Sequence, residues 1–227
     1  MTPDVAAVRR DIVAALLSFN GGFVDTAGFL GFQGLFTAHV TGNFVTLAAT
    51  LVMGTHGVVA KLLALPEFML VVALARIVGA LLRARQMPDL SILLVAKVCF
   101  LLAFFVLAVV LGPFPDSDAP AALLTAFAGI AGMAIQNGLQ RVHFANIPPT
   151  TLMTGNTTQA VLDVVDLISG AGNDAAAVRS RFVRTLRSII WFAGGCAVAA
   201  VLYYWAGLWC LAVPVVVGAA TTILHNH

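Results

Sequence analysis

The segment His39-Val40-Thr41-Gly42-Asn43 is a short polar interruption in a strongly apolar chain, and its Thr-Gly-Asn core returns at residues 154–156. Each copy follows a long apolar segment and precedes an apolar helical pattern. Two copies in the same context indicate a protein built from two related halves. We therefore predict one membrane domain over residues 1–227, with a first repeat at 12–112 and a second repeat at 120–224.

The composition places the chain in a lipid bilayer. Hydrophobic residues make up 60% of its 227 residues, charged residues only 10%, and the mean hydropathy is +0.99. A chain this apolar lacks the polar surface that a water-soluble fold needs. Apolar runs of about 18 to 20 residues, the length of a membrane-spanning helix, recur along it. Lipid is therefore the expected surrounding, and nucleic acid is not an expected partner.

Six long apolar runs are expected to form helices. Pro66-Glu67 predicts the start of the second run, because proline is favoured in the first turn of a helix. The segment after the first Thr-Gly-Asn is shorter: about 11 residues would form a helix of roughly 16 Å, half the thickness of a hydrocarbon core. The six runs cover residues 12–32, 68–82, 90–111, 120–139, 189–206 and 208–224.

The positions of Lys and Arg separate two topologies. If both short segments cross the bilayer, there are eight spans in two parallel repeats, and ten basic residues outside the span centres divide seven to three. If both are re-entrant, there are six spans. The same residues then divide nine to one, with Arg9, Arg10, Arg83, Arg85, Arg141, Arg179, Arg181, Arg184 and Arg187 inside and Lys61 outside.

The positive-inside rule favours six spans with both termini cytoplasmic. Three spans in each half give the two halves opposite orientations, an arrangement found in many secondary transporters. The predicted fold is an all-α integral membrane protein with six transmembrane helices plus two re-entrant half-helices in an inverted 3+3 repeat.

The Thr-Gly-Asn turns have two interpretations. Thr and Asn side chains can cap the free amides at a helix start, and Gly permits close backbone approach, so each motif can be purely structural. Alternatively, the two half-helix N-termini face each other and bind a polar or anionic group. The candidate ligand-binding residues of the turns are His39, Thr41, Gly42 and Asn43 in the first half and Thr154, Gly155 and Asn156 in the second.

Asp25 lies deep in the first apolar run, where a carboxylate is costly unless it is paired or protonated. It is a candidate proton-coupling or substrate-binding residue, or else it is bonded to nearby backbone or paired with Arg76 or Lys97. Gln136 and Asn137 can line the same site or bond across helices. Lys97 is expected to reach the interface or to form a pair. We expect a solvated helix end at Asp163.

No catalytic or cofactor motif is visible. The chain has no nucleophile elbow, phosphate loop or zinc-binding helix motif, and its three cysteines lack the paired spacing of a metal site or disulfide framework. We expect no metal, no cofactor and no enzymatic activity. An intramembrane enzyme would require a second ionisable group within hydrogen-bond reach of Asp25.

Four motifs together resemble the YoaK-like family of small bacterial membrane proteins. They are residues 22–25 (GFVD), 34–43 (GLFTAHVTGN), 132–137 (GMAIQN) and 150–156 (TTLMTGN). The resemblance covers roughly residues 12 to 224. It implies a multi-pass protein of the bacterial inner membrane whose biochemical function is unknown, and it supplies no substrate.

The leading hypothesis is a small secondary transporter, or channel-like carrier, of a small polar or anionic solute. The competing hypothesis is a membrane scaffold or regulatory partner of another complex, whose buried polar residues only hold helices together. A carrier needs a continuous polar cavity that joins Asp25 to both turns, whereas a scaffold satisfies those groups locally. A homodimer is compatible with so small a bundle.

Overall fold

The computed structural model describes residues 5–170 and 174–226, and in these ranges all regular structure is helical. Residues 1–4, 171–173 and 227, which belong to the predicted membrane domain of residues 1–227, lie outside the described ranges. The elements are α1 (Val5–Gly31), α2 (Gly42–Met53), α3 (Val58–Ala84), α4 (Asp89–Leu111), α5 (Pro120–His143), α6 (Met153–Ser169), α7 (Ala175–Ala206), the short 3-10 helix η1 (Gly207–Leu211) and α8 (Ala212–Asn226).

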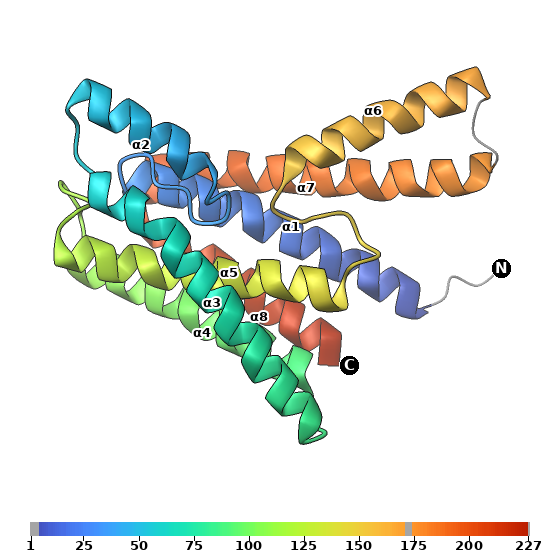
Figure 1. Ribbon diagram of the computed structural model, residues 1–227, viewed down its shortest axis with the longest axis horizontal. Helices are drawn as coiled ribbons and strands as arrows, with labels where there is room; N and C mark the ends of the chain where they lie inside the picture. The colour runs from blue at the N-terminus through green and yellow to red at the C-terminus, as the bar shows by residue number, and fades with distance from the viewer. Residues whose placement is uncertain (1–4, 171–173, 227) are drawn as a thin grey trace.

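Several of these helices can cross a membrane. Five stretches are long and apolar enough by length and composition, and the last of them, Ala175–His225, contains α7, η1 and α8. The chain reverses between α7 and α8 (Figure 1), at a backbone conformation (φ 56°, ψ −137°) that Gly207 can adopt because it has no Cβ. The chain is thus a multi-pass, all-helical membrane protein.

The third helix begins earlier than the sequence indicates. Pro66 does not start it: α3 begins at Val58 and carries Pro66 in its interior. The carboxylate of Asp118, in the loop before α5, accepts hydrogen bonds from the backbone amides of residues 57, 58 and 60 at 2.9–3.1 Å. The first amides of a helix have no partner within it, so an acceptor at this end stabilises the earlier start.

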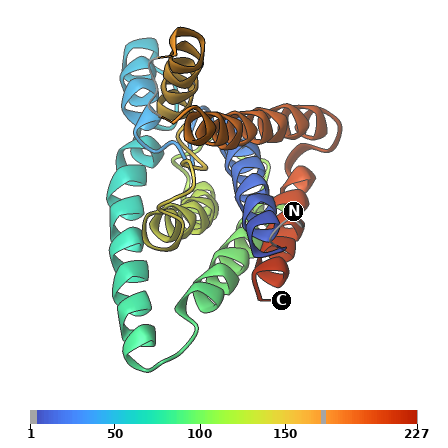
Figure 2. The same ribbon diagram turned by 90° about the vertical axis from the view of Figure 1, so that its right-hand side faces the viewer.

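The α1–α7 pair forms the tightest helix crossing. A Cβ placed on Gly22 would lie 2.1 Å from the backbone oxygen of Phe192, and one on Gly195 would lie 2.1 Å from that of Phe19. Small residues at a crossing let two membrane helices pack backbone to backbone. Helices α4, α5 and α8 pack on one side of this pair, and α3 stands at the edge of the bundle (Figure 2).

The two short helices begin near the middle of the molecule and run apart. In Figure 1, α2 extends toward one end of the bundle and α6 toward the other. Helix α2 packs against α3, and α6 packs against α7. The two loops that lead into these helices, residues 32–41 and 144–152, contain the segments just before each Thr-Gly-Asn. Their neighbours define the candidate site.

Candidate functional site

Asp25 holds the loop between α1 and α2. Its Oδ1 atom accepts hydrogen bonds from the backbone amides of residues 37, 38 and 39 at 2.8, 2.8 and 3.2 Å, and the residue is only 5% exposed. Three amide donors offset much of the free-energy cost of burying a carboxylate. Bonding to nearby backbone, one of the alternatives raised by the sequence, is therefore confirmed. Among the residues described, Asp25 forms no ion pair with Arg76 or Lys97.

The asparagine of each Thr-Gly-Asn motif closes its own loop. Asn43 accepts a hydrogen bond from the Phe36 amide at 2.8 Å and donates one to the Phe36 carbonyl at 2.9 Å. Asn156 donates to the Pro149 carbonyl at 2.7 Å. Both partners lie seven residues before the asparagine, and proline has no amide to donate in the second copy. The bond that the asparagine donates is therefore repeated in both halves, whereas, within the described chain, the bond that it accepts is present only in the first.

Gln136 and Asn137 hold the second loop onto α5 and α1. The Gln136 amide nitrogen donates to the Leu17 carbonyl at 2.9 Å and to the Thr150 hydroxyl at 3.1 Å. The Asn137 side-chain oxygen accepts a hydrogen bond from the Thr151 hydroxyl at 2.6 Å. These contacts join helices and loop, as polar side chains in membrane bundles often do.

The other predicted site residues are more accessible. Gly42 is half-buried, and a Cβ there would lie 2.9 Å from the ring of Phe36, so the first copy uses glycine for close approach, whereas a Cβ on Gly155 would meet no atom within 4 Å. No side-chain cap bond forms at the start of α2 or α6, so Thr41 and Thr154 do not cap these helices. The exposed motif residues are His39, Thr41, Thr154 and Gly155.

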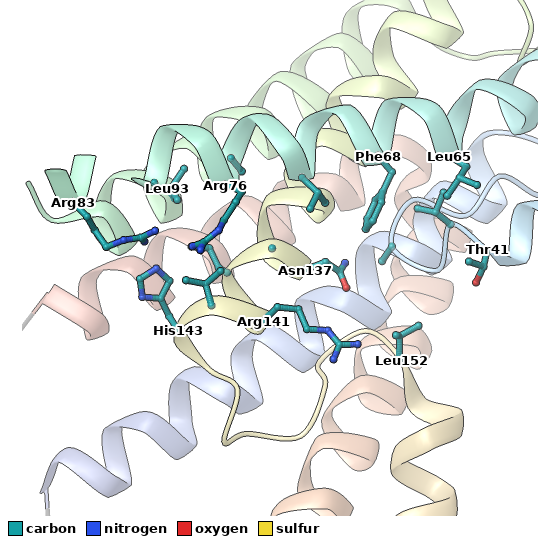
Figure 3. A pocket seen from close by; sticks show the side chains of 18 residues that line it. Thr41, Leu65, Phe68, Arg76, Arg83, Leu93, Asn137, Arg141, His143 and Leu152 are labelled. Carbon is teal, nitrogen blue, oxygen red and sulfur yellow. The ribbon is translucent and has the colours of Figure 1, made fainter. Parts of the chain in front are cut away.

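A cavity of about 480 Å³, which we call the first cavity, lies between α3 and α5 (Figure 3). Val40 and Thr41 of the first turn close one end of it. Its walls are mainly apolar, with Leu65 and Phe68 from α3 and Leu139 from α5 among them. A cavity of this size, mostly apolar with a few polar groups, is typical of small-molecule sites.

Four cationic or titratable side chains line the first cavity, and only two of them have an acidic partner. Arg83 and His143 both contact the Asp89 carboxylate, His143 Nε2 at 3.1 Å. Arg76 and Arg141 form neither a hydrogen bond nor an ion pair through their guanidinium groups within residues 5–170 and 174–226. In Figure 3, Arg76 extends from α3 toward α5, and Arg141 extends toward Leu152.

A second cavity, of about 680 Å³, adjoins the first. It is lined by His39 of the first turn and by residues 153–156 of the second. Arg141 and Leu152 line both cavities, so they stand at the boundary between them. The two hollows together reach both Thr-Gly-Asn turns.

The structure brings some predicted site residues to the cavities and leaves others out. His39, Thr41, Asn137 and residues 154–156 line one cavity or the other, whereas Gly42 and the buried groups Asp25, Asn43 and Gln136 line neither. Arg76 and Arg141 were not predicted as site residues. The available signal was the position of Arg76 in the middle of an apolar run, where a charge usually faces a cavity or a partner.

Asp163 is not at a solvated helix end. It is fully buried and accepts hydrogen bonds from Arg181 at 2.6 and 2.9 Å and from Gln159 at 2.8 Å. This ion pair joins α6 to α7, beside the second cavity.

Lys97 neither reaches an interface nor forms a pair. It is 0% exposed in α4, and its Nζ has no hydrogen-bond partner among the described residues. The expected snorkelling fails because Lys97 lies on the face of α4 that packs against α5, where the backbone of Lys97 contacts Gly132.

Across the described part of the chain, no group of three or more His, Cys, Asp or Glu residues is placed to hold a metal ion.

The helices and the enclosed polar residues define the class as multi-pass helical membrane proteins. The model of a protein family of unknown function, DUF1275, matches residues 13–224, and the chain belongs to this family. The resemblance to YoaK-like proteins is thereby confirmed. No curated protein and no solved structure matches the chain.

Proposed function

We propose that this protein is a small secondary transporter, or channel-like carrier, for a small polar or anionic solute. The observation that carries the proposal is the pair of adjoining cavities that share Arg141 and Leu152 and reach both Thr-Gly-Asn turns. Many secondary transporters place the substrate between two structural repeats, at interrupted helices. Cavities that touch the same motif in both halves fit that arrangement.

The corresponding fold proposal has six spans, with α2 and α6 re-entrant, in an inverted repeat. The hydrogen bond that the asparagine donates in both halves and the divergent paths of α2 and α6 support it (Figure 1). At 1.5 Å per residue, α2 is roughly 18 Å long and α6 roughly 26 Å, both shorter than a hydrocarbon core of about 30 Å. Both termini then lie on the cytoplasmic side of a bacterial inner membrane.

Flux measurements test the carrier. The purified protein is reconstituted in liposomes, and uptake is measured for small anions, amino acids and nucleobases. We expect at least one compound to enter faster than in protein-free liposomes, with Arg141→Gln lowering the rate about tenfold or more. Arg85→Gln, which removes the same charge from a residue lining neither cavity, should transport like the wild type. Equal flux in protein-containing and protein-free liposomes for the whole panel would contradict the proposal.

A scaffold or regulatory partner is the second candidate. Asp25 lines neither cavity, and Asp25, Asn43, Gln136 and Asn156 all have local hydrogen-bond partners, which is the pattern expected of a scaffold. In a scaffold, the motifs serve only to hold the loops and helices together through these bonds. Asp25→Asn and Asn43→Ala would then lower the melting temperature, while no compound in the panel would bind or cross. The same flux experiment therefore separates the two candidates.

A further inference from the structure

Arg76 lies at a depth where a charged side chain is costly. Helix α3 ends eight residues after it, which places Arg76 roughly 12 Å inside the helix end at 1.5 Å per residue. A guanidinium stays protonated under all physiological conditions, so it needs water or an anion at this depth. The described protein supplies no carboxylate to Arg76 or Arg141. Both guanidiniums are therefore free to receive an anion in the first cavity.

The walls of the first cavity favour an apolar body on that anion. Leu65, Phe68 and Val72 line it from α3, and Leu139 and Val142 line it from α5. A volume of about 480 Å³ is far more than an inorganic ion fills, and apolar walls gain free energy only when they contact apolar atoms. An organic anion satisfies both requirements.

The lining of the cavity supplies no carboxylate to a cationic group, because no Asp or Glu is among its described residues. Asp89, which contacts two of the lining residues, is already engaged by Arg83 and His143. An ammonium group on the ligand would lose its hydration without gaining a partner and would also lie near two guanidiniums. Amino acids are thus disfavoured relative to simple carboxylates.

We propose that the first cavity binds organic anions that carry a single carboxylate on an apolar body, with Arg76 binding the carboxylate inside the cavity and Arg141 offering a second binding position at the boundary with the second cavity. This inference rests on the proposed carrier function and names its substrate class. Arginine suits the role because its planar group can bind a carboxylate through two parallel hydrogen bonds. Since Arg141 lines both cavities, it is also the residue through which the anion would pass from one to the other.

The test is calorimetric binding to the full-length protein in detergent, with probes that differ by one group. The probes are 3-phenylpropionate, its neutral amide, phenylalanine (the same carboxylate with an added ammonium) and acetate (the carboxylate without the body). We expect 3-phenylpropionate to bind and each of the other three to bind at least about tenfold more weakly. Arg76→Gln and Arg141→Gln should weaken 3-phenylpropionate binding by about tenfold or more. Arg85→Gln is the matched control and should leave it unchanged.

Each other outcome overturns the proposal. The proposal is wrong if 3-phenylpropionate at millimolar concentration gives no heat of binding. It is also wrong if the amide or phenylalanine binds as tightly as 3-phenylpropionate. Unchanged binding in both arginine variants would contradict it as well. Arg76→Lys keeps the charge and separates loss of the anion contact from misfolding. It should restore part of the affinity for 3-phenylpropionate that Arg76→Gln loses. Binding without liposome flux would refute the carrier and leave the anion site, whereas flux of neutral solutes without carboxylate binding would do the reverse.

Discussion

Asp25 organises the first loop by gathering three successive backbone amides on one carboxylate oxygen. Backbone amides in a membrane must find partners inside the protein, because lipid provides none. The loop of residues 32–41 has no regular structure over most of its length, so it depends on side chains such as Asp25 and Asn43 for those partners. Asp25 and Asn43 together therefore fix the position of the first Thr-Gly-Asn turn.

Two substitutions of Asp25 separate its structural role from proton coupling. Asp25→Ala removes the acceptor and leaves three backbone amides without this partner. We therefore expect the free energy of unfolding to fall by about 1–3 kcal/mol or more, which a lower melting temperature in detergent would show. Asp25→Asn keeps an oxygen acceptor and should cost less. If Asp25 couples protons, Asp25→Asn would also abolish the dependence of flux on a pH gradient. Flux that keeps its pH dependence in this variant would exclude the coupling role.

The α1–α7 crossing illustrates how small residues determine the packing of whole elements. Gly22 and Gly195 each place their backbone against the carbonyl of the opposite helix, and the Cys196 thiol lies 3.4 Å from the Gly22 carbonyl oxygen. Helix α7 also contributes Arg181, Arg184 and Thr185 to the wall of the second cavity. The α1–α7 packing therefore bears both on stability and on the position of that wall.

Two adjacent glycines of α7 provide a matched test. Gly195→Ala would place a Cβ 2.1 Å from the Phe19 carbonyl oxygen, and a backbone atom cannot move aside, so we expect a loss of about 1–3 kcal/mol. Gly194→Ala meets no atom within 4 Å and should be neutral or slightly stabilising, because alanine has the higher helix propensity. Thermal melts of both variants measure this difference in stability. Equal melting temperatures would mean that the crossing is looser than the structure indicates.

At the scale of the whole molecule, the two topologies differ in the side of the membrane that each loop faces. In the six-span proposal the α3–α4 turn lies in the cytoplasm and the α2–α3 loop lies on the opposite side. In the eight-span alternative both positions are exchanged. The Asp118 cap and the Lys61 bonds to Gln33 and Thr50 lie at the same end of the molecule as the α2–α3 loop.

Site-directed labelling settles the orientation. In a variant with the three native cysteines replaced, His56→Cys and Met87→Cys place single thiols in exposed turns. The six-span proposal expects an impermeant thiol reagent, added to intact cells, to label residue 56 and to spare residue 87 until the membrane is opened. With a cytoplasmic N-terminus, which both topologies share, the opposite pattern would show that α2 crosses the bilayer and would contradict the inverted repeat.

The sequence alone was sufficient for properties that depend on local composition and length. The apolar runs predicted the membrane class and the positions of most helices, such as α4, expected at residues 90–111 and observed at Asp89–Leu111. The two Thr-Gly-Asn motifs marked the starts of α2 and α6. These predictions succeed because the length of an apolar helix and the polarity at its ends are written in consecutive residues.

Contacts between distant segments were decided only by the tertiary structure. The start of α3 depends on Asp118, about 60 residues away, and Asp163 is buried because Arg181 reaches it from α7. Arg76 and Arg141 become candidate anion-binding residues only because α3 and α5 line the same cavity. A local pattern shows that a charge in an apolar helix needs a partner, but packing determines whether that partner is a protein side chain or a ligand.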